Sequence, residues 1–118
     1  MQNLVIGASL KPYRYSNMAI KRLLSHHHEV KAIGLKEGEI DGVKILTGKP
    51  PLEDIDTVLM YINIDLQPDF YDYILGLKPR RIIFNPGTEN PEFQKMAKEN
   101  GIEPIQACSL VMMSIGSY

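Results

Sequence analysis

The chain has 118 residues, a formal net charge of −1 from 13 Lys and Arg against 14 Asp and Glu, and an apolar fraction of 44%. These values predict one soluble domain over residues 1–118 and exclude a nucleic-acid partner held by broad neutralisation of phosphates. The single cysteine excludes an internal disulfide, and no run approaches the ~20 apolar residues that span a bilayer, so we expect a cytoplasmic protein without a membrane partner.

Apolar runs in the first half of the chain predict strands, because each run is short and is bounded by polar or glycine residues. The expected strands are residues 4–6, 30–33 and 57–62, with residues 43–46 either a short strand or an extended stretch. Apolar residues at helical spacing predict a helix from Ser16, a suitable N-cap, to about Ser25. Polar, glycine-containing residues 36–42 predict a loop, and residues 50–54, which begin with two prolines, predict the first turn of a short helix.

The second half of the chain repeats this alternation of helices and strands. The expected elements are a helix over residues 67–77, a strand over 81–84, a helix over 91–100, a strand over 102–105 and a terminal helix over 109–115. Thr88 or Asn90 is expected to cap the second of these helices, and Gly101 to end it. The alternation predicts a single Rossmann-like α/β domain, which is a doubly wound parallel sheet of about five strands with helices on both faces.

In such a sheet the ligand site lies outside the carboxyl ends of the strands, where the strand order reverses. With the first strand at the centre, residues 7–15, 34–36, 61–65 and 85–88 line this crevice. The first of these segments joins a strand, a glycine turn and a helix, an arrangement that holds phosphates through backbone N–H groups and the positive helix end. It has one glycine, Gly7, where the G-x-G-x-x-G fingerprint has three, which points away from ordinary NAD enzymes.

Three cations lie in or near the expected crevice. We expect Lys11 and Arg14 to add charge to a pyrophosphate that is cradled by the turn and by the helix start at Ser16 and Asn17. The alternative is an unusually long but ordinary connection with solvated cations. Lys36 stands where a dinucleotide enzyme places an acidic residue that binds the ribose 2′-hydroxyl. A cation at this position suits a phosphorylated ribose. The alternative is that Lys36 is an ordinary loop lysine.

Three motifs occur in order along the chain. The first covers the end of the first strand and the turn after it, Val5-Ile6-Gly7-Ala8-Ser9-Leu10-Lys11-Pro12. The second is the turn Asn85-Pro86-Gly87 ahead of a helix, and the third is Asn100-Gly101-Ile102, which leads into a strand that is followed by Cys108. In this order and spacing they resemble the CoA-binding domain family. That family includes short stand-alone bacterial proteins and the nucleotide-binding domain of the succinyl-CoA synthetase alpha subunit. The chain departs from the short members at Gly34-Leu35-Lys36, where they have Asn-Pro, and at residues 61–65, which lack the basic residues of some relatives.

The resemblance implies a stand-alone protein that binds CoA or an acyl-CoA, and it also implies a homodimer or an association with an acyl-CoA enzyme. The adenosine diphosphate half is expected over the first turn, and the pantetheine arm is expected to run toward residues 85–87 and Cys108. The predicted ligand-binding residues are Gly7, Ala8, Ser9, Lys11, Arg14, Tyr15, Ser16, Asn17, Gly34, Lys36, Tyr61, Asn63, Asn85, Pro86, Gly87 and Cys108.

No acid–base pair, nucleophile with a base or metal cluster stands out in the sequence, so we expect a non-catalytic or regulatory binding protein rather than an enzyme. His26, His27 and His28 are consecutive and do not share a helix face, which disfavours a metal site. Cys108 is either an inert thiol or a reactive group near the thiol of CoA. Two alternative functions stay open: an NAD(P)-type redox sensor or enzyme fragment, with Glu37 on the ribose, and a protein-interaction domain that binds no nucleotide.

Overall fold

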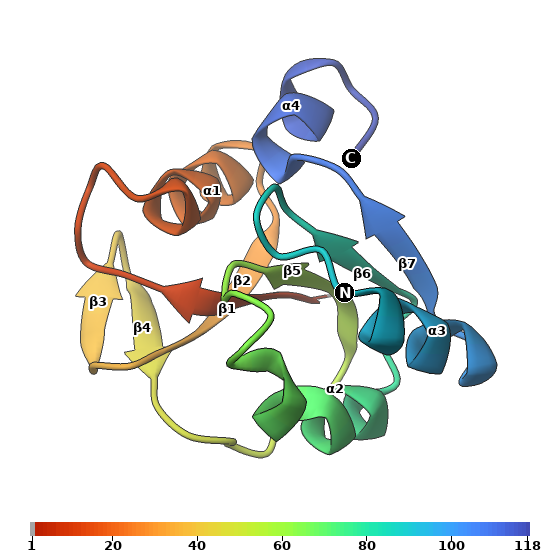
Figure 1. Ribbon diagram of the computed structural model, residues 1–118. Coiled ribbons are helices and arrows are strands. Elements are labelled where there is room, and N and C mark those ends of the chain that lie inside the picture. The colour runs from red at the N-terminus through yellow and green to blue at the C-terminus, as the bar shows by residue number, and fades with distance from the viewer. Residues whose placement is uncertain (1) are drawn as a thin grey trace.

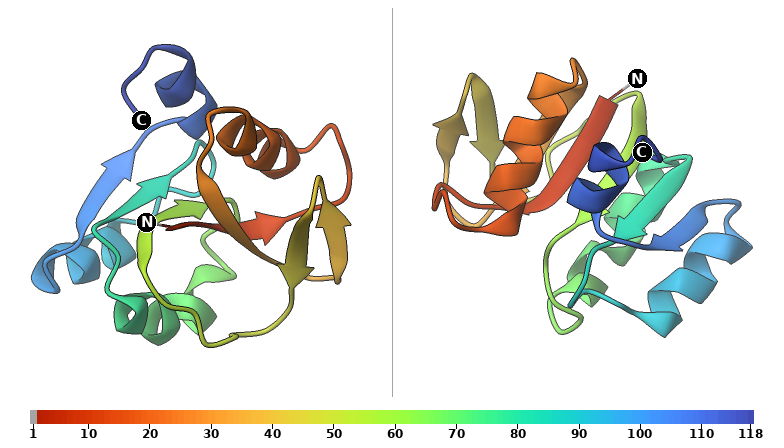
Figure 2. Two further views of the ribbon diagram at one scale, coloured as in Figure 1. Left: turned by 180° about the vertical axis from the view of Figure 1, so that it is seen from behind. Right: turned by 90° about the horizontal axis from the view of Figure 1, so that it is seen from above.

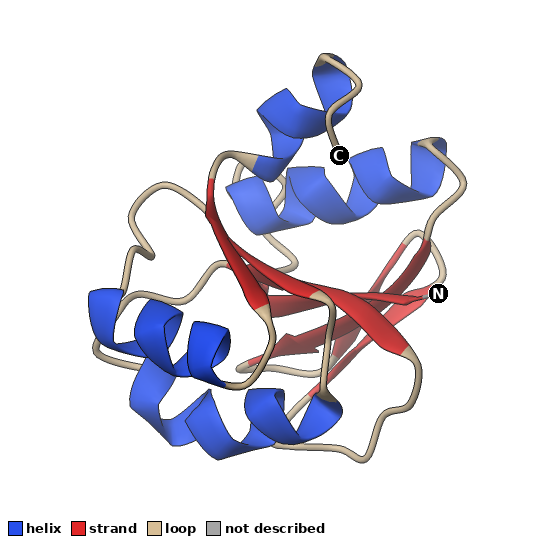
Figure 3. Ribbon diagram, turned by 90° about the vertical axis from the view of Figure 1, so that its right-hand side faces the viewer, coloured by secondary structure: helices blue, strands red, loops and turns tan. Residues whose placement is uncertain are grey.

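The structure, a computed structural model, describes residues 2–118 and has a seven-stranded sheet between two helical layers (Figure 1). The strands are β1 (Gln2–Ala8), β2 (Glu29–Gly34), β3 (Gly38–Ile40), β4 (Val43–Leu46), β5 (Ile55–Met60), β6 (Arg81–Phe84) and β7 (Glu103–Gln106). The helices are α1 (Tyr15–Ser25), the 3₁₀ helix η1 (Gln67–Phe70), α2 (Tyr71–Leu77), α3 (Pro91–Glu99) and α4 (Ser109–Ser114). Helices α1 and α4 cover one face of the sheet, and η1, α2 and α3 cover the other (Figure 3).

The strand order is β3-β4-β2-β1-β5-β6-β7, and every neighbouring pair is parallel except β3 with β4. Strand β1 therefore lies at the centre, with the β3–β4 pair at one edge and β7 at the other (Figure 2). The expected Rossmann-like α/β class is confirmed. The sheet is larger than expected, and it is mixed rather than wholly parallel.

Residues 36–42, expected as a loop, contain strand β3, which joins β4 through a two-residue turn. Ile40 pairs with Val43 across the hairpin, and Asp41 and Gly42 between them have φ angles of 46° and 88°. Two positive φ angles define the type I′ hairpin turn, and Asp-Gly is one of its preferred sequences. The loop prediction is therefore wrong, because the turn folds the polar segment back against β4.

Residues 50–54 form no helix, so the expected helical turn is also wrong. Asp54 has a φ of 58°, and its carbonyl accepts a hydrogen bond from the N–H of Gln2 at 3.0 Å. The carbonyl of Pro50 accepts one from the hydroxyl of Tyr73 at 2.6 Å. Between leaving β4 and entering β5 the chain must cross β2 and β1. Extended backbone spans about twice the distance per residue that a helix does, so this crossing favours an extended segment over a helix.

The amino end of α3 agrees with the capping residue predicted from the sequence, whereas the amino end of α1 does not. Helix α1 begins at Tyr15 with Arg14 at the N-cap and no side-chain capping bond. Ser16 therefore lies inside the helix, and its expected role as the cap is wrong. Helix α3 is capped by Asn90, as expected: its side chain accepts the N–H of Phe93 at 3.0 Å. The helix expected over residues 67–77 is split into η1 and α2.

The core has two layers, one on each face of the sheet, because alternate residues of a strand point to opposite faces. Val5 and Leu59 belong to the layer under α1 and α4. Leu4, Val58 and Met60 belong to the layer under α2 and α3. All five are fully buried, which explains why the central strands are continuous apolar runs. Among residues 2–118 no helix has the length and apolar character that crossing a membrane requires.

Candidate functional site

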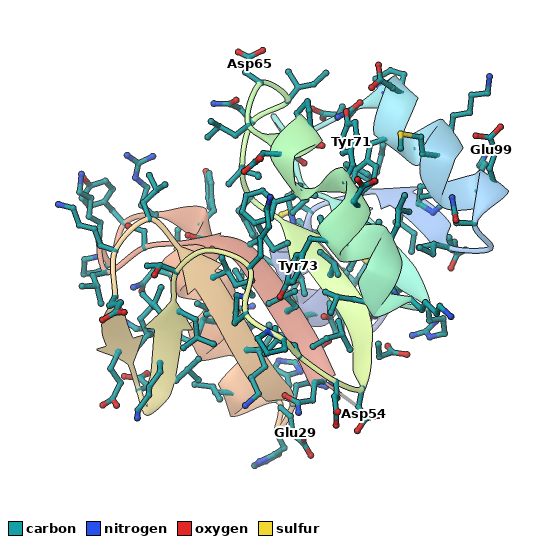
Figure 4. The ribbon with its side chains drawn as sticks, turned by 90° about the horizontal axis from the view of Figure 1, so that it is seen from below. Glu29, Asp54, Asp65, Tyr71, Tyr73 and Glu99 are labelled. Atoms are coloured by element: carbon teal, nitrogen blue, oxygen red, sulfur yellow. The ribbon has the colours of Figure 1, made fainter. Side chains whose placement is uncertain are left out.

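The strand order reverses between β1 and β5, which places the ligand crevice of this sheet at their carboxyl ends. From β1 the chain moves outward to β2 and then to the β3–β4 hairpin at the edge, and it returns to β5 on the other side of β1 (Figure 1). Residues 9–14 follow β1, residues 61–66 follow β5, and residues 85–90 follow β6. Figure 4 shows Asp65 of these loops at one end of the molecule, and Glu29 and Asp54, at the amino ends of β2 and β5, at the other.

Gly7 lets the first loop, residues 9–14, begin directly against the loop after β5. Its φ of 103° lies in a region that L side chains rarely adopt. A Cβ at this position would lie 2.9 Å from the carbonyl carbon of Tyr61. The N–H of Tyr61 in turn donates to the carbonyl of Ile6 at 2.9 Å. Glycine is therefore required here for two reasons: backbone conformation and the close approach of two loops.

The amino end of α1 lies at the same edge of the sheet, because α1 follows the first loop. Arg14 occupies the N-cap position, no side chain caps the helix, and its first turn contains no acidic residue. The N–H groups of the first helical turn have no acceptor within the helix. These groups and the partial positive charge of the helix end together suit an anion.

Lys11 and Arg14 flank this helix end, and both are exposed. Neither forms an ion pair with a carboxylate within residues 2–118. Tyr13 and Tyr15 beside them are 70% and 69% exposed. The first loop therefore presents two unneutralised cations and two aromatic rings to solvent, next to an uncapped helix.

The first loop is held in shape by its own polar groups. The hydroxyl of Ser9 accepts the N–H of Lys11 at 3.2 Å, and the carbonyl of Ser9 accepts Nδ2 of Asn17 at 2.9 Å. Asn17 is only 2% exposed, and its Oδ1 has no hydrogen-bond partner among the described residues. Ser16 is also buried. The side chains of Ser9 and Asn17 thus fix the loop against the start of α1.

The end of β2 and the segment after it lie against the end of β1 and the first loop. A Cβ on Gly34 would lie 2.5 Å from the carbonyl oxygen of Ala8, and one on Gly38 would lie 2.7 Å from the side chain of Leu10. Lys36 stands between these two glycines and is exposed. The fold therefore brings the segment that carries Lys36 up to the loop that carries the other two cations.

Tyr61 and Ser109 meet on the opposite wall of the crevice. Burial raises the pKa of Tyr61 to about 12, against a smaller lowering by the neighbouring hydroxyl of Ser109. Neither hydroxyl has a well-aligned hydrogen bond within residues 2–118. Cys108 carries a half-buried free thiol at the N-cap position of α4. The side chains of Tyr61 and Ser109 are neutral at neutral pH, so the part of the wall that they form suits an uncharged part of a ligand.

The remaining predicted residues of the crevice differ in exposure. Asn63, Pro86 and Gly87 are exposed in the loops after β5 and β6, and Oδ1 of Asn63 accepts the N–H of Asp65 at 3.0 Å. Asn85 is 2% exposed, and both ends of its side-chain amide are hydrogen-bonded within the protein. Asn85 therefore presents no free side-chain group at the surface.

Gln67 is a buried polar residue beside the crevice that the sequence pattern did not single out. It is 0% exposed, and its Nε2 donates to the carbonyls of Ile62 at 3.0 Å and Thr88 at 2.8 Å. These acceptors belong to the loops after β5 and β6. No sequence motif marks this residue, because a buried amide is recognised by the two loops that it joins and not by its neighbours along the chain.

Other polar features lie away from the crevice. His28, beyond the carboxyl end of α1, has its ring centre 5.3 Å from that of Tyr118. Burial lowers the pKa of His28, and the neighbouring charges of His26 and Arg81 lower it further. Within residues 2–118 no group of three or more His, Cys, Asp or Glu is arranged to hold a metal. Two shallow hollows of about 370 and 390 Å³ lie along α3 and β7 and over β3 and β4.

Residues 2–114 match the model of a family described as CoA binding domain. A solved structure of an uncharacterised protein is 48% identical, with a TM-score of 0.96, over 99% of this chain and 97% of that chain. The structure of cell-free ID.343 from Thermus thermophilus is 21% identical, with a TM-score of 0.87, over 99% of this chain and 90% of that chain.

A dinucleotide-forming acetyl-coenzyme A synthetase from Candidatus Korarchaeum cryptofilum is 18% identical, with a TM-score of 0.74, over 90% of this chain and 26% of that chain. At the identities of the Thermus and Korarchaeum proteins the likeness shows the fold alone. None of the curated proteins matches the sequence.

Proposed function

The chain belongs to the CoA-binding domain family, and from that premise we propose that it is a stand-alone protein that binds CoA or an acyl-CoA. The proposed site is the crevice at the carboxyl ends of β1 and β5. The proposed role is binding or regulation rather than catalysis.

The observation that carries this proposal is the uncapped amino end of α1 with Lys11 and Arg14 beside it. CoA carries a diphosphate and a 3′-phosphate, so it needs concentrated positive charge. The chain as a whole has a net charge of −1, so an anionic ligand depends on such a local cluster. Helix N–H groups, the helix dipole and two unneutralised cations meet that requirement in one place.

In the proposed arrangement the adenosine diphosphate half lies over the first loop. The backbone of Gly7, Ala8 and Ser9 and the first turn of α1 hold the diphosphate, with Lys11 and Arg14 at its edge. Ser16 and Asn17 contribute through their backbone, because their side chains are buried. The exposed ring of Tyr15 supplies a flat apolar surface beside these charged groups.

Lys36 is proposed to contact the 3′-phosphate of the ribose. The support is the close packing of Gly34 against Ala8 at the end of β1 and of Gly38 against Leu10 of the first loop, which brings the segment of Lys36 toward the proposed diphosphate site. A cation at this point distinguishes CoA from dephospho-CoA, which lacks the 3′-phosphate.

The pantetheine arm is proposed to run along the opposite, uncharged wall. Tyr61 and Cys108 border this wall, and Asn63, Pro86 and Gly87 are exposed in the loops beside it. Pantetheine has two amides and an apolar stem but no charge, so it matches a wall whose tyrosine stays neutral at neutral pH. The thiol of the ligand would then lie at the Cys108 end.

We also propose that the protein acts in the cytoplasm and that it forms a homodimer or associates with an acyl-CoA enzyme. The single cysteine supports a reducing compartment. Leu35 and Ile115, which are 92% and 71% exposed, would contribute apolar contact area. Light scattering of the purified chain, with and without CoA, tests the assembly: a dimer supports self-association, and a monomer leaves only the association with an enzyme.

The test of the function is a thermal-shift comparison of the purified chain with CoA, acetyl-CoA, dephospho-CoA, NAD and NADP. A ligand that binds only the folded state raises the Tm by mass action. We expect a rise with CoA and acetyl-CoA, a smaller rise with dephospho-CoA and none with NAD. A rise with NAD or NADP alone would identify a dinucleotide binder instead, and no rise with any nucleotide would favour a protein-interaction domain.

A further inference from the structure

Two buried side-chain amides, those of Asn85 and Gln67, connect the segments that form the uncharged wall of the crevice. Asn85 is 2% exposed and Gln67 is 0% exposed. A buried amide is costly unless its donors and acceptors are paired, so each position has a structural or functional reason to be polar.

Asn85 connects three segments at the carboxyl end of β6. Its Nδ2 donates to the carbonyl of Met60, the last residue of β5, at 3.1 Å. Its Oδ1 accepts the N–H of Ser109, the first residue of α4, at 2.7 Å. Its own carbonyl accepts both the N–H and the hydroxyl of Thr88, at 3.0 and 2.8 Å. One residue therefore fixes the end of β5, the loop after β6 and the start of α4.

Gln67 connects the loop after β5 to the loop after β6. Both hydrogen atoms of its amide are used, because Nε2 donates to the carbonyls of Ile62 at 3.0 Å and Thr88 at 2.8 Å. Its Oε1 accepts Nδ2 of Asn90 at 3.0 Å, and the same Nδ2 also donates to the hydroxyl of Tyr71 at 2.8 Å. This amide has no donor left for a ligand.

We propose that Asn85 and Gln67 are positioning residues of the ligand site, which set the separation of the loops after β5 and β6 and of α4 without touching the ligand. The inference rests on the proposed CoA-binding function. The residues that border the ligand on this wall are neighbours of the bonded groups: Tyr61 follows Met60, Pro86 follows Asn85, and Cys108 precedes Ser109. Loss of either amide frees these neighbours to move, while the phosphate-binding loop after β1 keeps its shape.

The variant Asn85→Asp tests the proposal, because its hydrogen-bonding capacity changes with pH. A neutral carboxylic acid accepts from the N–H of Ser109 and donates to the carbonyl of Met60, as the amide does. An ionised carboxylate keeps the first bond and repels the carbonyl oxygen of Met60. At mildly alkaline pH we expect CoA to bind about tenfold more weakly than to the wild type, and at mildly acidic pH we expect most of this loss to be recovered.

Two measurements are made together on the full chain: CoA affinity by calorimetry, and backbone hydrogen exchange of the ligand-free protein. In the alkaline range, exchange is expected to rise in residues 61–66, 85–90 and 108–112 and to stay unchanged in residues 9–17. The matched control is Asn100→Asp, an exposed amide at the end of α3 that bonds only to the carbonyl of Met96. It is expected to leave both measurements at the wild-type values across the same pH range.

The variant Gln67→Met provides a second test if the ionised aspartate unfolds the chain. Methionine has a similar side-chain volume and does not titrate, and it removes the three side-chain hydrogen bonds of Gln67. It is expected to raise exchange in residues 61–66 and 85–90 and to weaken CoA binding by about tenfold, with no dependence on pH.

The outcomes separate the inference from the proposed function. Weaker binding with unchanged exchange in the ligand-free variants would mean that the amides contact the ligand, and the positioning role would be wrong. Wild-type affinity in both variants would also overturn it. If the wild type itself does not bind CoA, the proposed function fails, and the exchange pattern alone then decides whether the two amides order the loops.

Discussion

Gly7 and Tyr61 meet backbone against backbone at the point where the strand order reverses: a Cβ on Gly7 would lie 2.9 Å from the carbonyl carbon of Tyr61. This contact joins the loop that carries Lys11 and Arg14 to the uncharged wall that carries Tyr61. The two halves of the proposed ligand site are therefore held at a fixed distance by a residue with no side chain.

Replacement of Gly7 by alanine is expected to destabilise the protein by more than about 1 kcal/mol, because a φ of 103° is strained for alanine and the new methyl group meets backbone. The free energy of unfolding in urea measures this. The matched control is Gly76→Ala in α2, where a Cβ would meet nothing within 4 Å and φ is not positive. It is expected to stabilise the helix by about 0.5–1 kcal/mol. Equal effects of the two substitutions would contradict the close approach at Gly7.

The double variant Lys11→Gln/Arg14→Gln is expected to weaken CoA binding and to reduce the dependence of its affinity on salt concentration. Both side chains are exposed and unneutralised, so their charge acts on the ligand and contributes little to folding. The unfolding free energy is expected to change by less than about 0.5 kcal/mol.

The control for this double variant is Lys21→Gln/Arg22→Gln, which removes two exposed cations from the later turns of α1. Calorimetry at several salt concentrations is expected to show wild-type behaviour for the control. If both pairs weaken binding equally, the phosphates are attracted by the overall charge and not by the first loop.

The variant Arg80→Gln is expected to raise the pKa of Asp56. Hydrogen bonds from the Arg80 guanidinium to both carboxylate oxygens, at 3.0 and 3.1 Å, are the main reason that this pKa lies below its usual value of 3.8. The folded-state pKa is lowered, so the bond stabilises the protein at neutral pH, and the stabilisation is lost as the pH falls below 3.8.

Carboxyl NMR titration measures the pKa of Asp56 directly, and urea unfolding at neutral and acidic pH measures the linked stability. Arg80→Gln is expected to be less stable than the wild type at neutral pH and equally stable in acid. Because Arg80 is largely exposed, the difference at neutral pH is expected to be small. An unchanged Asp56 titration in the variant would contradict the assignment.

The class of the fold could be predicted because it depends on patterns that are local in sequence. Residues 82–84 of β6 are buried and apolar on both faces, and Asn90 directly precedes a helix with an apolar stripe. Residues 43–46 are one possible strand in the sequence and form β4, whereas the sequence pattern does not predict β3, although Asp41-Gly42 is a favourable type I′ pair. Residues 36–39, before Ile40, are charged or glycine, because an edge strand such as β3 buries less of its surface.

The cation cluster at the first loop could be predicted from its position after a central strand, whereas the roles of the buried amides could not. Asn85 looked like a surface turn residue, and Gln67 looked like the start of a helix. Three of their hydrogen bonds, to Met60, Thr88 and Ser109, join positions more than 20 residues apart. Such partners become visible only when the loops that follow different strands are brought to one edge of the sheet.

A map of backbone amide NMR shifts during titration of the full chain with CoA locates the ligand site residue by residue. The largest shifts are predicted in residues 7–17, with further shifts in residues 34–36, 61–63, 86–87 and 108. Shifts confined to the hollow along α3 and β7 or to the β3–β4 hairpin, with residues 7–17 unchanged at saturation, would contradict the proposed site.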